Sequence, residues 1–345
     1  MVAAMSPFDS QPRPSTKITR ASRAEDDKPL RVASWNLGNL GKRADEHRYH
    51  IFAEILGRRM GAPHIIAVQE LCGDLDADGK RQPEATHHAH RLIRELQRYT
   101  GHTYAYCEVP NAQGSNVSSD PYRIRNGFFY RTDRIALNAP DYGMLTNNPM
   151  AWRAHASSFR NLRAPLIGQF TDKVTGENHY IANLHLCSDH GKNASMHALR
   201  YEQLGHVTDF YTQLGKEAYD RDVTAHFMVL GDFNANWAQE PVSYSSSKRI
   251  PRDLPSRMEA VDLNQATKAI QHNTVRSNHS GERPVIDHAF VSHSLRNRLI
   301  GLDNPDTRRL GAPSDHNPIC LTIATSPPAR DVCLVPLSHG AAFSR

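Results

Sequence analysis

The sequence predicts an α/β domain in which two β-sheets pack face to face and helices cover their outer faces. The 345-residue chain is 39% hydrophobic and 22% charged, so it can bury a sizeable core. About nine short runs rich in β-branched and aromatic residues alternate irregularly with only three long amphipathic patterns. This proportion is too rich in strands for a doubly wound parallel sheet and favours two packed sheets.

The individual elements follow from the spacing of apolar residues. Strands are expected at residues 30–37, 64–71, 103–109, 127–131, 165–170, 180–186, 226–233, 285–292 and 319–324. Helices are expected at 46–60, 85–99 and 194–219. In the longest of these, Leu204, Val207, Phe210 and Leu214 recur with an approximate period of 3.6.

The two ends of the chain differ in composition from the part between them. Residues 1–29 mix serine, proline, arginine and acids without periodicity, and 326–345 are similar, so we expect two tails around a single domain at 30–325. Two internal stretches, 138–162 and 235–283, show no predicted element, and loops of this length inside a compact domain are usually either functional or wrongly assigned. There is no membrane span and no apolar signal segment. We expect a soluble protein, either cytoplasmic or exported without a cleavable Sec signal.

The charge of the chain indicates which kind of molecule it binds, and its cysteines indicate its redox state. Basic residues exceed acidic ones by 41 to 36, and 32 of them are arginine, whose planar guanidinium binds phosphate in two places. This favours an anionic partner, although a net charge of +5 is equally typical of an ordinary soluble surface. No feature indicates an obligate protein partner. Five cysteines without a CxxC pair suggest a mostly reduced protein, with one or two disulfides left open.

Polar residues of catalytic types follow several of the predicted strands. They are Asn36, Glu70, His185, Asp232, Asn234, Asp287, Asp315 and His316. A single carboxylate after an apolar run most often faces water. Together, however, the residues supply what phosphate chemistry with a divalent metal requires: hard oxygen ligands, neutral amides and two histidines.

Each residue type suggests a role. Glu70 and Asn36 would supply oxygens to Mg²⁺ or Mn²⁺. Asp232, placed after a buried strand, would orient the attacking water. Asn234 lies two residues on, on the same face, and would donate to a phosphoryl oxygen.

Asp315 and His316 are adjacent and precede Pro318 in an extended turn. Their side chains can therefore diverge. We expect Asp315 to face the metal and His316 to face a carboxylate such as Asp287.

Six segments carry a resemblance to a known family. WNLGNL, VQEL, NLHL, LGDFNAN, VIDHAFVS and SDHNPI occur in this order and resemble the motifs of the endonuclease/exonuclease/phosphatase superfamily, the fold of deoxyribonuclease I and exonuclease III. The resemblance extends over about residues 30–324. It implies a four-layered α/β sandwich of two mainly antiparallel sheets flanked by helices, and phosphoester hydrolysis that depends on Mg²⁺ or Mn²⁺.

The resemblance also implies roles, position by position. Glu70 matches the metal-binding glutamate, with Asn36 as its partner and Asp315 as the closing aspartate. Asp287 matches the carboxylate that pairs with the final histidine, here His316. The remaining matches are Asp232 as the catalytic aspartate, Asn234 as the phosphate-holding asparagine and His185 as a proton-transfer histidine.

Within the superfamily, the motifs are most similar to those of deoxyribonuclease I. The segment FRNLRAPLIGQF resembles its phosphate-binding segment and places Arg163 at the phosphate. Tyr122, beside Arg123, is a candidate for contact with a sugar or base, although aromatic packing is the more common role of a tyrosine. One position departs from the pattern: Ile124 stands where that enzyme carries a glutamate that supports the first histidine. Either Glu108 or Asp120 substitutes for it, or His185 has no carboxylate partner.

The leading hypothesis is therefore a DNA endonuclease with little sequence specificity, cleaving the P–O3′ bond by in-line attack of water. A sphingomyelinase-like phospholipase or a phosphoinositide phosphatase could use the same site. A catalytically silent scaffold is disfavoured because every core position keeps a competent residue.

Three other features have more ordinary interpretations. His87, His88 and His90 lack matching zinc-ligand spacing. Asp74, Asp76 and Asp78 resemble the start of an EF-hand loop without its closing glutamate, which leaves a structural Ca²⁺ as the less favoured alternative. Cys187 is not required by the chemistry.

Overall fold

Within the residues that the structure describes, each of the two β-sheets contains six strands and one parallel pair. The computed structural model describes residues 28–42, 46–80, 82, 84–108, 124–138, 165–188, 194–220, 224–235, 258, 261–269, 274–275, 285–307, 310–311 and 313–325, without the side chains of 194–199 and 268–269. The first sheet contains, in spatial order, β11 (Leu299–Asp303), β12 (Ile319–Ile323), β1 (Leu30–Leu40), β2 (Ile65–Leu71), β4 (Arg125–Arg131) and β3 (Tyr104–Glu108). Its parallel pair is β1 and β2.

The second sheet repeats this arrangement. It contains, in order, β5 (Ile135–Asn138), β6 (Leu166–Asp172), β7 (Asn178–His185), β8 (His226–Asp232), β10 (Asp287–Ser292) and β9 (Leu263–Gln265). Here β7 and β8 are the parallel pair. The parallel strands therefore lie in the middle of both sheets, and each pair ends at one edge.

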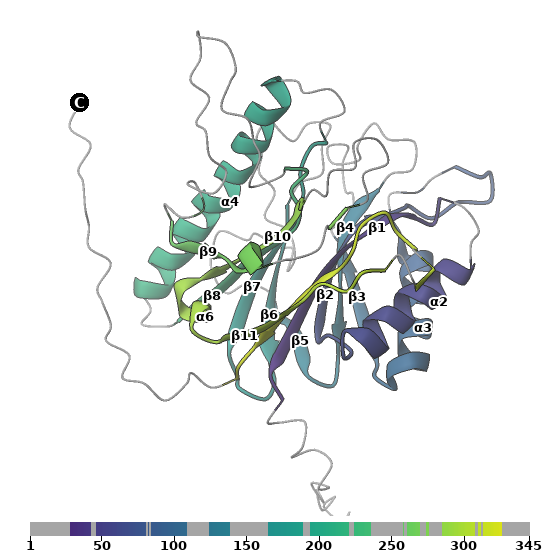
Figure 1. Ribbon diagram of the computed structural model, residues 1–345, viewed down its shortest axis with the longest axis horizontal. Helices are drawn as coiled ribbons and strands as arrows, with labels where there is room; N and C mark the ends of the chain where they lie inside the picture. Colours follow the sequence, from purple (N-terminus) through teal and green to yellow (C-terminus); the bar gives the residue numbers. More distant parts are fainter. Residues whose placement is uncertain are drawn as a thin grey trace, which may run out of the picture.

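Helices cover the outer face of each sheet, as Figure 1 shows. On one side lie α2 (Glu46–Glu54), which continues into a π-helical turn at Ile55–Arg59, and α3 (Thr86–Thr100). On the other side lies α4 (Ala194–Asp220), and the short α6 (His293–Arg296) follows β10.

Three buried apolar clusters separate the four layers. Trp35 and Phe129 pack beneath α2 and α3, whereas Phe128, one residue earlier, lies between the two sheets. Phe227 and Phe210 belong to the third cluster, between the second sheet and α4. Successive strand residues point to opposite faces, and both faces of the central strands are buried. This explains why these strands appear in the sequence as continuous apolar runs.

The predicted four-layered sandwich of mainly antiparallel sheets is confirmed. All nine predicted strands and the three helices are present, with small shifts at their ends. Three further strands, β5, β9 and β11, were not predicted; each lies at the edge of a sheet, and β9 lies within the stretch 235–283 where no element was expected. The predicted tails, except for residues 28 and 29, lie outside the described residues, and the single-domain boundaries stay a prediction.

Two further sequence expectations concern cysteines and membranes. The four cysteines in the described part of the chain are buried and form no disulfide with one another. Among the described helices, none combines the length and the apolar character needed to cross a bilayer.

Candidate active site

The sheet topology brings the predicted site residues to one end of the sandwich. Parallel strands end at the same edge, so Glu70 at the end of β2 lies beside β1, and His185 at the end of β7 pairs in register with Asp232 at the end of β8. Strand β10 runs antiparallel to β8 and begins at this edge, where Asp287 pairs with Asp232. His316 precedes β12, which is antiparallel to β1.

Glu70 occupies a bulge that turns its side chain toward the second sheet. Its φ of 59° is left-handed, and the pairing of β2 with both neighbouring strands shifts register there. Asn36 Nδ2 donates to Oε1 at 3.1 Å, and the backbone N–H of Asn39 donates to Oε2 at 2.9 Å. Burial nevertheless raises the pKa of the Glu70 carboxyl, because two hydrogen bonds do not fully replace its hydration.

Asp232 lies at the centre of the site and is almost fully buried. Its carboxylate accepts hydrogen bonds from Asn36 Nδ2 at 3.0 Å and from the backbone N–H of Asn234 at 2.8 Å. Burial raises the pKa of Asp232 to about 6 against the opposing positive charge of His316, and the negative charge of Asp287 adds to the increase. A nearby cation would therefore be strongly attracted.

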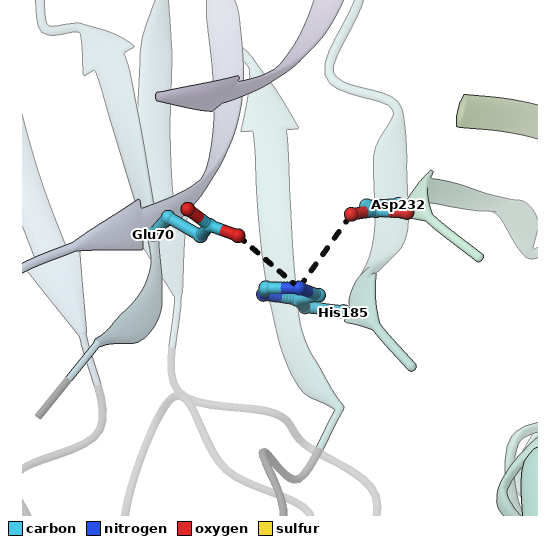
Figure 2. A group of neighbouring side chains, drawn as sticks. All are labelled: Glu70, His185 and Asp232. Atoms are coloured by element: carbon cyan, nitrogen blue, oxygen red, sulfur yellow. Dashed lines mark ion pairs between the residues drawn. The ribbon is translucent and has the colours of Figure 1, made fainter. Parts of the chain in front are cut away.

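Glu70, His185 and Asp232 converge on one point from three strands (Figure 2). His185 Nε2 lies 3.6 Å from Glu70 Oε1 and 3.5 Å from Asp232 Oδ2. One ligand atom from each residue lies within 4.8 Å of the others. Two carboxylates with raised pKa values, buried Asp232 and half-buried Glu70, form with the imidazole a donor set that fits a divalent metal ion.

The three predicted metal ligands are not equally placed. Glu70 belongs to the cluster, and the Asn36 amide contacts both of its carboxylates, with Oδ1 turned toward the Gly38 N–H at 3.0 Å. A half-turn of that amide would present its oxygen instead. Asp315 is exposed at the rim, and its Oδ1 lies 3.4 Å from Ser314 Oγ.

His316 and Asp287 form a buried hydrogen-bonded pair. His316 Nδ1 and Asp287 Oδ2 are 2.8 Å apart, and Nε2 lies 3.8 Å from Asp232 Oδ2. Burial alone would lower the pKa of His316, but the charges of Asp287 and Asp232 outweigh it and raise the pKa to about 10. The imidazole therefore carries a proton at neutral pH and presents Nε2–H to the site.

The placement of the substrate-contacting residues is only partly described. Asn234, with a φ of 49°, donates from Nδ2 to the carbonyl of Leu186 at 3.0 Å, a bond that uses one of its two amide hydrogens. This bond links the ends of β7 and β8. Arg163 and Tyr122 lie outside the described residues, as does Asp120.

The position of the expected glutamate is filled by a buried isoleucine, Ile124. Glu108, considered as its substitute, accepts hydrogen bonds from the Ala85 N–H at 2.9 Å and from Tyr106 Oη at 3.0 Å, and it pairs with Arg125. The acids that face His185 are instead Glu70 and Asp232.

The structure describes the contacts of three other features that the sequence singled out. Asp74 accepts from the backbone N–H groups of His87 and His88 at the start of α3, and so caps that helix. Asp76 accepts from the backbone N–H groups of Asp78 and Lys80 within a turn. Neither group is among the described clusters that could hold a metal. Cys187 is buried.

Sequence reasoning missed two contributors. The backbone N–H of Asn39 binds Glu70, and the Ser314 hydroxyl donates to the Asn36 carbonyl at 2.7 Å while accepting from the His316 N–H at 3.1 Å. The Gly-Asn pair at 38–39 is typical of a left-handed turn, and it was the only sequence feature that indicated the contact of the Asn39 N–H. Ser314 belongs to the SDHNPI motif, but nothing in the sequence assigned it a role.

Gly231 places Asp232 and is expected to tolerate no side chain. Its φ is +140°, and a Cβ there would lie 2.1 Å from the Leu184 carbonyl oxygen of the neighbouring strand. Gly231→Ala should therefore lower the free energy of unfolding by more than about 1 kcal/mol and reduce activity further by displacing Asp232. Chemical denaturation and a hydrolysis assay measure the two effects.

Gly215, inside α4, provides the matched control. A Cβ at Gly215 would have nothing within 4 Å. Gly215→Ala should stabilise the protein by roughly 0.5–1 kcal/mol and leave hydrolysis unchanged. If the Gly231→Ala variant were as stable as the unmodified protein, Gly231 would not be required to place Asp232.

One family model and several solved structures match this chain. A model described as the Endonuclease/Exonuclease/phosphatase family matches residues 33–316. No curated protein matches the chain.

Several solved structures share the fold. An endonuclease/exonuclease/phosphatase family protein from Bacteroides thetaiotaomicron is 20% identical, with a TM-score of 0.53 over 85% of this chain and 94% of that one. D. rerio TDP2, complexed with single-strand DNA product, is 18% identical, with a TM-score of 0.52 over 86% of this chain and 99% of that one. A mannosyl-6-phosphatase from Bacteroides thetaiotaomicron is 20% identical, with a TM-score of 0.51 over 85% of this chain and 98% of that one.

Proposed function

The chain belongs to the endonuclease/exonuclease/phosphatase family, and from this premise we propose that it is a metal-dependent phosphodiesterase that cleaves DNA with little sequence preference. Members of this family are hydrolases that act on phosphodiesters or phosphate esters. The observation that carries the proposal is the convergence of Glu70, His185 and Asp232 beside the Asp287–His316 pair.

Of the three clustered residues we assign Glu70 to the metal, with Asn36 and Asp315 as further oxygen donors, which leaves Asp232 and His185 for proton transfer. Bound Mg²⁺ or Mn²⁺ would neutralise negative charge on the phosphate. The left-handed turn at Gly38 and Asn39 keeps the Glu70 carboxylate in place through the Asn39 N–H.

Asp232 is the proposed acceptor of the proton from the attacking water. With a pKa of about 6, its carboxylate is ionised at neutral pH and remains basic enough to take up a proton. The Asp287–His316 pair assists by orienting water and phosphate: Asp287 fixes the imidazole through Nδ1, and the protonated Nε2 of His316 is available as a donor beside Asp232.

The leaving group requires a proton as the P–O3′ bond breaks. We assign this proton to His185, whose Nε2 faces the centre of the site. Asn234 and Arg163 would hold the phosphoryl oxygens as negative charge grows on them, and Tyr122 would contact the sugar or base. The water proton thus passes to Asp232 while His185 protonates O3′.

The choice of DNA rests on charge rather than on the fold. The excess of arginine suits a polyanion. The similar folds include TDP2 bound to single-strand DNA product and a mannosyl-6-phosphatase, so a phosphate monoester is the second candidate. Lipid phosphodiesters and inositol phosphates stay as the alternatives raised by the sequence motifs.

A substrate panel tests the proposal. The 345-residue protein is incubated with plasmid DNA, RNA, sphingomyelin, inositol phosphates and mannose 6-phosphate, with Mg²⁺ and with EDTA. We expect the protein to nick plasmid in the presence of Mg²⁺ and to leave it intact in EDTA. Hydrolysis of a lipid or monoester while plasmid stays intact would reject DNA as the substrate. The assignment of the catalytic residues would still stand.

Salt dependence should reveal contacts with several DNA phosphates. Affinity for duplex is expected to fall steeply between 50 and 200 mM NaCl, with a log–log slope of about −0.9 per phosphate contact. Arg163→Ala should weaken binding and flatten this slope by up to about one unit. Arg58, an exposed arginine paired with Glu54, is the control, since Arg58→Ala should leave the slope unchanged. An unaltered slope in the Arg163 variant would remove that residue from the phosphate-binding set.

A further inference from the structure

Arg48 of α2 reaches two separate loops at the edge of the candidate site. Its Nη2 donates to the carbonyls of Leu37 at 2.5 Å and Gly38 at 2.8 Å, and Nη1 lies 3.5 Å from the carbonyl of Asn39. Its Nε donates to the carbonyl of Pro313 at 2.8 Å. The planar guanidinium therefore joins the turn after Asn36 to the loop that carries Asp315 and His316.

Two of these carbonyls belong to peptide groups that bind the proposed metal ligands. The Gly38 carbonyl and the Asn39 N–H form one peptide group: the carbonyl accepts from Arg48, and the N–H donates to Glu70 Oε2. The Leu37 carbonyl and the Gly38 N–H form the preceding one, whose N–H donates to Asn36 Oδ1. Arg48 thus contacts Asn36 and Glu70 through one peptide group each.

The positive charge of Arg48 strengthens the hydrogen bonds that these peptide groups donate to Asn36 and Glu70. A cation at a peptide oxygen polarises the group and makes its N–H a better donor, as in any chain of hydrogen bonds in a low dielectric. Arg48 also supports the turn itself, in which Gly38 and Asn39 both have left-handed φ values, 56° and 55°. Asparagine adopts this conformation more readily than most residues, but at some cost relative to glycine.

The second loop is held against the first at the same place. Ser314 Oγ donates to the Asn36 carbonyl and accepts from the His316 N–H. A Cβ added to Gly38 would lie 3.0 Å from Ser314 Oγ and 3.2 Å from Asp315 Oδ1. The two loops are therefore closely packed, and Arg48 bonds to both.

We infer that Arg48 is a positioning residue that orients Glu70 for metal binding through the peptide group 38–39. Through the peptide group 37–38 it also fixes the Asn36 amide, whose Nδ2 donates to Glu70. The inference rests on the proposed function in treating Glu70 as a metal ligand.

Direct metal binding tests the inference independently of any substrate. Mn²⁺ binding is measured by electron paramagnetic resonance for the unmodified 345-residue protein and for its Arg48→Ala and Arg48→Lys variants. Loss of a group that orients metal ligands typically costs 10–100-fold in metal affinity, and we expect this for Arg48→Ala. Arg48→Lys keeps the charge but not the planar fork, so its affinity should lie between the two.

Chemical rescue and a matched control separate positioning from stability. Millimolar guanidinium should restore part of the Mn²⁺ affinity of Arg48→Ala, since Arg48 is only half-buried. Arg298, which donates to the carbonyls of Ala324 and Thr325 and pairs with Glu177, is the control. It contacts His226 at the start of β8, about 20 Å along the strand from Asp232. Arg298→Ala should lower stability and leave Mn²⁺ affinity unchanged.

The possible outcomes distinguish this inference from the proposed function. Unchanged Mn²⁺ affinity in folded Arg48→Ala overturns the role of Arg48 and leaves the nuclease proposal standing. If Arg48→Ala fails to fold, Arg48→Lys decides, and affinity equal to the unmodified protein overturns the inference. Weakened Mn²⁺ binding in a protein that cuts no DNA supports Arg48 and rejects the DNA substrate. Absence of Mn²⁺ binding by the unmodified protein overturns both.

Discussion

Replacing His316 or Asp287 by alanine is expected to lower the rate of phosphodiester hydrolysis by about 10²- to 10⁴-fold. Their 2.8 Å hydrogen bond makes the two residues one unit: without Asp287, the imidazole loses both its orientation and the charge that contributes most to its raised pKa. The double variant should therefore lose little more than the worse single variant, because residues that act as a unit are non-additive. Turnover at saturating metal and substrate measures all three.

His179 provides the control for removal of a buried histidine. It is on β7, the strand that ends in His185, but near the opposite end, where it stacks on His226 at 5.2 Å between ring centroids. His179→Ala is expected to reduce stability without lowering turnover beyond the loss of folded protein. Losses that multiply in the double variant at His316 and Asp287 would show that the two residues act independently.

The central strands were predictable because both of their faces are buried. The run 226–232 is buried throughout, and the apolar runs at 65–71 and 319–323 are buried at nearly every position. The edge strand β11 has no such pattern: only the middle of each sheet is covered on both sides, and Ile300 of β11 is 62% exposed. Strand β9 has three residues, which is too short for a periodic signal.

The site was predictable to the extent that strand ends determine it. Glu70, His185 and Asp232 each follow an apolar run, and parallel pairing brings such ends together. The contribution of backbone groups has no comparable signal in the sequence. Which carbonyls Arg48 binds, and that the Asn39 N–H faces Glu70, depend on a left-handed turn and on how α2 docks against it.

EDTA is expected to abolish hydrolysis and Mg²⁺ or Mn²⁺ to restore it, whereas Glu70→Gln should remain inactive at metal concentrations that saturate the unmodified protein. The amide keeps the volume of Glu70 but lacks the charge that a divalent ion requires. Since burial raises the pKa of Glu70, its ionised form destabilises the metal-free protein at neutral pH. In EDTA, Glu70→Gln should therefore be at least as stable as the unmodified protein. Full activity at limiting Mg²⁺ would exclude Glu70 as a ligand.

The pH dependence of metal stabilisation gives this prediction a second readout. A ligand that binds only the folded state at 100 times its Kd adds about 2.7 kcal/mol of stability. Metal ligands must be deprotonated, and burial raises the pKa of the proposed ligand Glu70. The neighbouring Asp232, with a pKa of about 6, also loses its negative charge as the pH falls through that value. The increase in melting temperature caused by Mn²⁺ should consequently be large at pH 7.5, small at pH 5 and absent in Glu70→Gln. Glu108→Gln, which removes another carboxylate of raised pKa, should keep the Mn²⁺-induced increase, because the contacts described for Glu108 are with Arg125, Tyr106 and the Ala85 N–H.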